Sequence, residues 1–417
     1  MFEKVIKINM MSTVAIGLVM LYLGKFLRTK VKFFQRFCIP APVIGGFLFS
    51  LIHLILKTQN LASFEMDTTL KDPFMMVFFT SIGLGADIET LKKGGKGFFV
   101  FTAVTGLLII LQNFLGMFLA KILKQNVLFG LACGSITMAG GHGTAGAWGP
   151  TLESLGLVSG QVISMAAATF GVIMGSLIGG PLGSSLIRRY NLKSNDLKKD
   201  QIDLEENGVL RIPLGEKRGQ IPSELKGEDF LKTLLIMFIA ISIGVIVNKI
   251  IAKNIFIEGT PLNLPEYVVS MIIAGLYVNT LGKNKIYKID KRANDICGDI
   301  GLNIFLVVAL ITLDLTQLKS VFGPMLIILF AQTFAIILFA YFIVFRIMGK
   351  NYDAAVLAGG LCGFGMGATY NAMANMDSIT SEYGSSRKAY FIVPMVGAFA
   401  LDIINVVAIT FFAQLKF

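Results

Sequence analysis

The sequence predicts an all-α polytopic membrane protein made of two inverted-topology repeats of five transmembrane helices, each with a re-entrant glycine-rich hairpin. The 417 residues are 54% hydrophobic and only 15% charged, which is too little charge for a soluble chain of this length. Uncharged runs recur that exceed the roughly 20 residues needed to cross a bilayer. A glycine-rich apolar stretch also occurs once in each half of the chain.

Ten apolar segments fit full spans. In the first half they lie near 9–27, 40–57, 72–91, 97–120 and 160–187. In the second half they lie near 230–252, 265–282, 295–316, 321–345 and 388–415. A long polar segment of mixed charge separates the halves and is typical of a hydrated linker. We therefore expect an N-terminal repeat over 1–190, a linker over 191–229 and a C-terminal inverted repeat over 230–417.

The two glycine-rich stretches align with each other. One runs from Asn126 to Trp148 and the other from Asn351 to Met376, shifted by 225 or 226 residues throughout. A broken apolar segment at matching places in both halves of a membrane protein is typical of a secondary transporter. We expect re-entrant segments over 126–150 and 351–376.

The placement of lysine and arginine favours stretches that enter the membrane and return. In that case the basic clusters at 28–36, 92–96 and 283–292 share one face with the linker, as the positive-inside rule requires. If both stretches crossed, the first two clusters would lie outside and the bias would be lost. Both termini are then outside, the linker is cytoplasmic, and the two hairpin tips meet near the midplane. The net charge of +11 serves orientation, so nucleic acid is not an expected partner.

The hairpins carry the expected substrate site. Glycines such as those of the GGHGT motif at 140–144 permit irregular backbone, which survives at membrane depth only when it lines a cavity or is buried in protein. Helix N-termini at such breaks offer free N–H groups to an anion. A glycine packing face is the alternative, and a neutral imidazole bonded to a backbone carbonyl is the alternative for the histidine. The expected substrate-binding residues are Ser135, Thr137, Gly140, Gly141, His142, Gly143, Thr144, Gly365, Gly367, Thr369 and Asn371.

Asp402 and Asn405 lie three residues apart inside the last span, and this spacing places them on one helix face. A carboxylate inside a span is costly and usually functional. Oxygen ligands suit a small hard cation, so the pair predicts cation binding or gating. The alternative is a structural hydrogen bond to a neighbouring helix.

Two other function classes compete with a carrier. An anion channel would conduct without the gradient of a coupling ion. A membrane-embedded enzyme using His142 would need a nucleophile or a metal, and the sequence has no G-x-S-x-G turn and no H-E-x-x-H. The four cysteines stand apart without a C-x-x-C pair and predict reduced core residues. We expect no enzyme activity and no cofactor.

The motifs resemble the bacterial sodium/glutamate symporter family nearly end to end. The resemblance is carried by Ile39-Pro-Ala-Pro-Val-Ile-Gly-Gly46, the GGHGT motif at 140–144, Gly349 to Ala358, and Val393 to Phe399 leading to Asp402. It implies sodium-driven uptake of L-glutamate in the bacterial inner membrane, with sodium as the coupling ion. It also implies a homodimer in membrane lipid and an elevator-type movement of a transport domain. Under this resemblance, the cation expected at Asp402 and Asn405 is sodium.

The chain departs from the family pattern at Tyr370-Asn371, where the family has proline then threonine. Because this change lies in the second hairpin, a related dicarboxylate or amino acid remains the alternative substrate. No arginine or lysine lies in the middle of a span. Backbone N–H groups and His142 are therefore expected to hold much of the second carboxylate.

Overall fold

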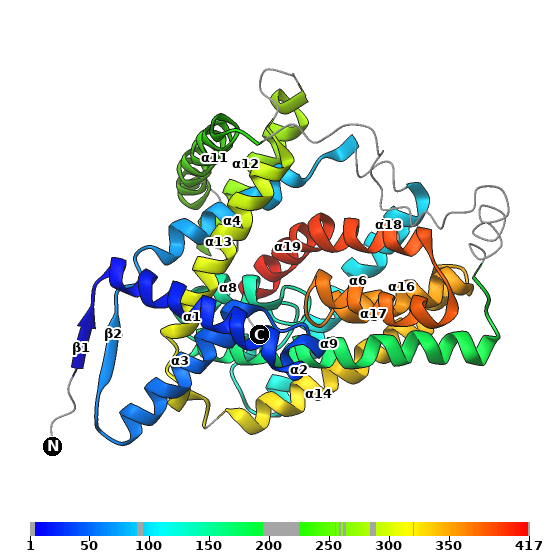
Figure 1. Cartoon of the computed structure of the whole chain (residues 1–417), viewed down its shortest axis with the longest axis horizontal. Coiled ribbons are helices and arrows are strands. Elements are labelled where there is room, and N and C mark those ends of the chain that lie inside the picture. Colours follow the sequence, from blue (N-terminus) through cyan, green and yellow to red (C-terminus); the bar gives the residue numbers. More distant parts are fainter. Residues whose placement is uncertain are drawn as a thin grey trace.

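The computed structural model describes residues 5–89, 95–194, 225–254, 256–257, 260–261, 264–283, 289–319 and 321–415. Most of the expected linker, residues 195–224, lies outside the described residues. The described chain is almost entirely helical (Figure 1). Two short strand pairs complete it: β1 (Val5–Ile8) is parallel to β2 (Ser63–Met66), and β3 (Phe256–Ile257) is antiparallel to β4 (Thr260–Pro261).

The helices follow the apolar segments of the sequence. The first half contains α1 (Met10–Lys30), α2 (Lys32–Arg36), α3 (Ala41–Thr58), α4 (Lys71–Gly85), α6 (Gly95–Ile122), α7 (Val127–Ala132), α8 (Gly141–Ser154) and α9 (Gly160–Tyr190). The second half contains α11 (Gly227–Asn254), α12 (Glu266–Asn279), α13 (Lys291–Ile311), α14 (Phe322–Phe339), α15 (Phe345–Ile347), α16 (Tyr352–Phe364), α17 (Thr369–Tyr383), α18 (Arg387–Met395) and α19 (Leu401–Gln414). Short π-helical segments join α14 to α15 and α18 to α19.

Seven helices of the described chain are long and apolar enough to cross a membrane. Two expected spans are shorter in the structure. Apolar sequence predicts spans over 72–91 and 265–282, but α4 has 15 residues and α12 has 14. At about 1.5 Å per residue, each is shorter than a hydrocarbon core of about 30 Å. The turn at Ala86 ends α4, and Pro265 immediately precedes α12.

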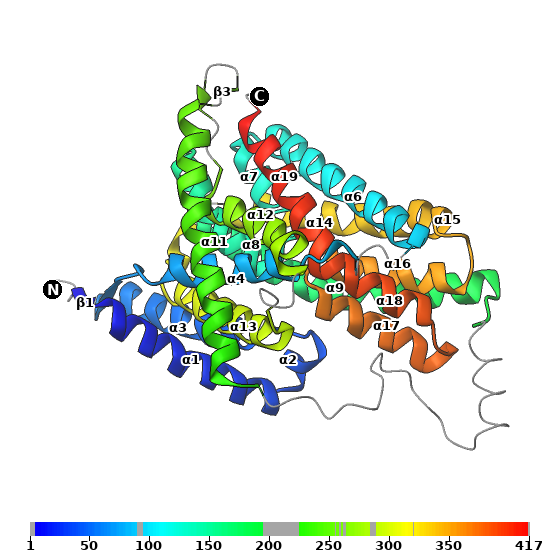
Figure 2. The same cartoon turned by 90° about the horizontal axis from the view of Figure 1, so that it is seen from above.

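The helices form two packed groups (Figures 1 and 2). The first, here called the α13 group, consists of α1, α3, α4, α11, α12 and α13. The second, the α16 group, consists of α6 to α9 and α14 to α19. Helices pack far more extensively within each group than between the groups. Each group therefore draws on both halves of the sequence.

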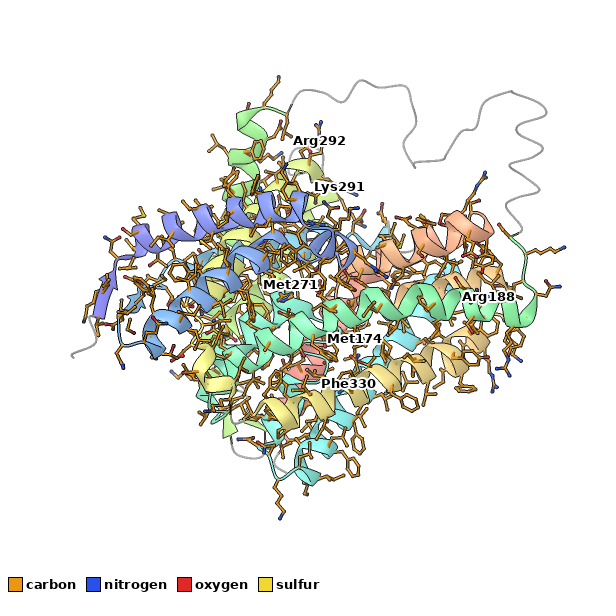
Figure 3. The ribbon with its side chains drawn as sticks, turned by 60° about the horizontal axis from the view of Figure 1, so that its bottom comes forward. Met174, Arg188, Met271, Lys291, Arg292 and Phe330 are labelled. Carbon is orange, nitrogen blue, oxygen red and sulfur yellow. The ribbon has the colours of Figure 1, made fainter. Side chains whose placement is uncertain are left out.

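Side chains on neighbouring helices illustrate this division (Figure 3). Met174 on α9 and Phe330 on α14 belong to adjacent helices of the α16 group, and Arg188 lies near the end of α9. Lys291 and Arg292 begin α13 and lie apart from them, in the α13 group.

Small residues allow close packing inside the α13 group. A Cβ added at Gly45 of α3 would lie 1.9 Å from the carbonyl oxygen of Met20, and one at Gly24 of α1 would lie 2.1 Å from that of Ala41. The helices α1 and α3 therefore touch backbone to backbone, which is the usual way for membrane helices to associate tightly.

Two connections leave the α13 group, one from α4 to α6 and one from α13 to α14. The first is bonded to α12 and the second to α3, which are both helices of that group. Asn279 of α12 donates to the carbonyl of Ala86 at 2.8 Å and accepts from the N–H of Ile88 at 2.9 Å. Lys57, near the end of α3, lies 2.6 Å from a carboxylate oxygen of Asp314. The α13 group thus fixes the point from which each connection departs.

Large apolar side chains cover the outer faces of α1, α6, α11 and α14. A protein that works in water rarely exposes so continuous an apolar surface, whereas a bilayer requires one. The exposed residues include Val19, Tyr22 and Phe26 on α1, Phe114 and Phe118 on α6, Phe238 and Ile246 on α11, and Phe330 and Phe334 on α14.

Candidate substrate and ion site

Each glycine-rich stretch folds as two helices separated by a break. The first break lies between α7 and α8 and the second between α16 and α17. The breaks touch: Gly141 has a φ of +58°, and a Cβ added there would lie 2.4 Å from the carbonyl oxygen of Gly367. Only glycine fits this position without strain. Residues 226 positions apart in the sequence therefore meet at one point.

Both breaks present a helix N-terminus without a side-chain cap. Gly140 precedes α8 and Ala368 precedes α17, and neither end has a side chain that accepts from the first-turn N–H groups. The first N–H groups of a helix have no partner within it, and the helix dipole adds partial positive charge there. Two anion-attracting ends therefore lie close together.

A cavity of about 980 Å³ opens at this meeting point, between the α13 and α16 groups. Its volume is at the upper end of the usual range for ligand pockets. The predicted site residues that line the cavity are Gly140, Gly141, His142, Gly143, Thr144, Gly367, Thr369 and Asp402.

The other predicted residues do not line the cavity, and hydrogen bonds made by their side chains or their backbone hold the breaks in place. Asn405 Nδ2 donates to the carbonyl of Ser135 at 3.1 Å, and Asn371 Nδ2 donates to that of Val172 at 2.9 Å. The hydroxyl of Thr137 donates to a carbonyl of its own segment. Ser135, Thr137, Asn371 and Asn405 have no exposed surface.

Two glutamines connect the second break to the crossing of α6 and α14. Gln112 Nε2 donates to the carbonyl of Gly365 at 2.7 Å, and Gln332 Nε2 donates to the carbonyl of Gln112, also at 2.7 Å. The neighbouring Asn113 accepts from the N–H of Ser135 at 2.9 Å. Mid-span amides thus satisfy backbone groups that the breaks leave without helical partners.

Several buried polar atoms near these breaks lack a partner within the described residues. They include Ser135 Oγ, Asn405 Oδ1 and Asn371 Oδ1. A buried oxygen without a partner is costly, and neutral oxygens of this kind suit a small hard cation. Ser135 and Asn405 are brought together by their hydrogen bond, so two of these oxygens belong to one locality.

His142 is buried and lies 3.0 Å from the hydroxyl of Thr169 through Nε2. The same hydroxyl lies 2.9 Å from the carbonyl of Met165. The ring bonds to a hydroxyl, where a backbone carbonyl was one expectation.

Asp402 enters the cavity next to a distortion of the last span. Pro394 cannot supply a helical N–H, and the helix then widens into a π segment over Val396–Ala400 before α19 begins. Such segments often occur at functional sites. A Cβ added at Gly397 in this segment would lie 2.7 Å from the hydroxyl of Thr369, so the segment packs against the tip of α17.

Three charged residues that are not among the predicted site residues also line the cavity. Lys25 and Arg28 line it from the last turns of α1, and Asp299 lines it from α13. A signal was present, because a three-residue spacing puts Lys25 and Arg28 on one helix face. Arg28 was predicted only to orient the chain, as part of the basic cluster at 28–36, and Lys25 lies outside that cluster. Backbone N–H groups and His142 were expected to supply most of the attraction for carboxylates. Lys25 and Arg28 are two further cations in the same cavity that can attract them.

The sequence matches the family model of the sodium/glutamate symporters over residues 6–385. The sodium/glutamate symporter of Escherichia coli is 37% identical over 409 residues, which cover 98% of both chains. That of Haemophilus influenzae is 37% identical over 394 residues, 94% of each chain. A solved sodium proton antiporter from Methanocaldococcus jannaschii is 15% identical and covers 97% of both chains with a TM-score of 0.40, a likeness too weak to carry an argument.

Proposed function

Because the chain belongs to the sodium/glutamate symporter family, we propose that it binds L-glutamate in the cavity between the α13 and α16 groups. The chain is a multi-pass membrane protein and a sodium-coupled glutamate symporter, and it is not an enzyme. Sodium is its coupling ion. The observation that carries the assignment of the site is the meeting of two uncapped helix N-termini at one cavity that also contains a carboxylate.

The chemistry of this cavity suits a zwitterion with two carboxylates. The first turns of α8 and α17 offer N–H donors to the carboxylates, with Gly140–Thr144 lining one side and Gly367 and Thr369 the other. Asp402 offers an acceptor for an ammonium or a cation. Ser135, Gly365 and Asn371 do not line the cavity and keep these helix ends in position.

We propose that Asp402 and Asn405 belong to the part of the site that binds sodium. Asp402 lines the cavity, and Asn405, one turn further along α19, has an unpaired buried Oδ1 beside Ser135. Glutamate carries one net negative charge, so entry into a negative interior costs about 2.3 kcal/mol per 100 mV. One sodium ion cancels that charge, and coupling requires each ligand to raise the affinity for the other.

The arrangement of the two helix groups supports an elevator-type movement of the α16 group against the α13 group. Packing between the groups is sparse, and the cavity lies between them. We propose that the halves are inverted repeats with both termini outside, and that a homodimer forms in the bacterial inner membrane. Labelling of single cysteines at the exposed Ser154 and Glu382 tests this orientation: reaction at 154 from outside and at 382 from the cytoplasm is expected, and the opposite result contradicts it.

Uptake of labelled glutamate by purified, reconstituted protein tests the function. Uptake should follow an inward sodium gradient and collapse when potassium replaces sodium, because a carrier needs its coupling ion. Flux of equal size without sodium would indicate an anion channel. Competition by aspartate, malate and citrate then separates glutamate from a related dicarboxylate or amino acid as the preferred substrate. Tyr370 lines the cavity and is a position at which this chain departs from the family pattern. It is therefore the residue expected to affect substrate preference.

Replacing Asn405 with alanine should raise the sodium concentration required for half-maximal uptake, because it removes an unpaired buried oxygen and the bond to Ser135. Loss of such a ligand costs on the order of tenfold in ion affinity. Initial uptake rates against sodium concentration measure the change. Thr410→Val is the control, because Thr410 lies further along the same helix and its hydroxyl donates only to the carbonyl of Val406 in that helix among the hydrogen bonds of the described residues. An unchanged sodium dependence in Asn405→Ala contradicts the assignment.

A further inference from the structure

Three exposed charged side chains lie at the mouth of the cavity. Lys25 and Arg28 are exposed cations on one face of α1, and Asp299 is an exposed anion on α13. Within the described residues, no salt bridge involves any of the three. Lys25 lies over the ring of Tyr22, 4.9 Å from its centroid. Charges of both signs thus face the cavity without neutralising each other.

The position of Arg28 connects the mouth to the binding breaks. Arg28 lines the same cavity as Tyr370, at the start of α17, and Cys38. The guanidinium and the helix ends at the breaks therefore line one cavity. A guanidinium binds carboxylates through paired donors, so it suits the cargo of this carrier.

All three charges belong to the α13 group, whereas the helix ends at the breaks belong to the α16 group. If the α16 group carries the substrate, charges on α1 and α13 contact it only while the cavity is open toward them. Arg28 belongs to the basic cluster expected on the cytoplasmic face. The cavity volume of about 980 Å³ leaves room for a second position of an amino acid beyond the helix ends.

We propose that Lys25, Arg28 and Asp299 form a docking subsite for an α-amino dicarboxylate at the cytoplasmic mouth of the cavity. The two cations hold a carboxylate and Asp299 faces the ammonium, so the subsite binds glutamate during its exchange with the cytoplasm. This inference rests on the proposed binding of glutamate in the cavity. It adds that the subsite acts on one face of the membrane only.

The double variant Lys25→Gln/Arg28→Gln tests the subsite in the full-length, reconstituted protein. The half-saturating glutamate concentration is measured separately from the cytoplasmic and the external side, with inside-out and right-side-out vesicles. A rise of roughly three- to tenfold is expected from the cytoplasmic side, since exposed charges contribute modestly. The external value should not change. The effect should shrink as ionic strength rises.

Controls separate a subsite from charges that merely orient the chain. Lys30→Gln removes a cation from the same helix end that does not line the cavity, and it should leave both values unchanged. Arg28→Lys retains the charge but loses the paired donors, so it should keep only part of the cytoplasmic affinity. Asp299→Asn should weaken cytoplasmic binding of glutamate but not of glutarate, which has both carboxylates and no ammonium.

The outcomes are decisive in both directions. A cytoplasmic shift absent from the external side and from Lys30→Gln supports the subsite. An equal shift on both faces, an equal shift in Lys30→Gln, or no shift in the double variant overturns it. Failure of the proposed function itself looks different, because the unmodified protein would then show no sodium-dependent glutamate uptake from either side.

Discussion

Replacing Gly141 with leucine is expected to abolish sodium-driven glutamate uptake while leaving a folded, membrane-inserted protein. Two effects act at this residue. A side chain at φ +58° costs about 1–2 kcal/mol, and the added Cβ would lie 2.4 Å from the carbonyl oxygen of Gly367. That oxygen belongs to the other break, so the clash is relieved only if the two helix N-termini move apart. An uptake assay measures the loss of transport, and a size-exclusion profile of the purified variant shows whether it is still folded.

Gly95 provides a matched control, because it has the same φ of +58° and no atom within 4 Å of an added Cβ. Gly95→Leu carries the backbone cost without the clash. We expect Gly95→Leu to transport glutamate and Gly141→Leu not to. Equal activity of the two variants would indicate that the contact between the breaks is ordinary packing of glycine faces, and the proposed arrangement of the site would be wrong.

The glycine content of the two stretches predicted breaks in their helices because glycine tolerates backbone that other residues do not. Their contact at Gly141 and Gly367 was inferred only from topology, since a separation of 226 residues leaves no local signal. Inverted repetition itself remains a prediction. The charge bias and the internal alignment support it, and the described helices are compatible with it.

Residue type could not separate the cavity lining from its support. Serine, threonine and asparagine predict polar contacts, but these contacts serve a substrate or a broken backbone equally well. Ser135 and Asn371 are buried and do not line the cavity, whereas Thr144 and Thr369 do. The difference follows from which side of each break faces the α13 group, and this depends on packing between helices distant in sequence.

The place of Arg28 at the cavity could not be predicted for a different reason, and its orienting role stays a prediction. Arg28 lies in the last turn of α1, where basic residues normally orient a membrane protein. The cavity reaches this turn because the neighbouring connection through Cys38 and Pro40 forms part of its wall. Periodicity also gave no warning of the π segment at Val396–Ala400, because one extra residue in a turn leaves the apolar pattern almost unchanged.

Replacing Asp402 with asparagine is expected to abolish uptake driven by a sodium gradient. Asp402 lines the cavity and makes no salt bridge within the described residues. An uncompensated carboxylate at membrane depth is costly and is stabilised when a cation binds beside it. Asparagine keeps the size and one oxygen but loses the charge, so the cation loses most of its attraction. Initial uptake rates over a range of sodium concentrations measure the effect.

The partner of Asp402 is either sodium or the ammonium group of glutamate, and substrate choice separates them. If the partner is sodium, Asp402→Asn loses sodium-dependent transport of glutamate and of glutarate alike. If the partner is the ammonium, the variant discriminates less against glutarate and keeps its sodium dependence. Asp402→Glu retains the charge and should keep part of the activity in either case. Full glutamate transport by Asp402→Asn, with unchanged sodium dependence, would exclude Asp402 from the site, because neither cation would then need its charge.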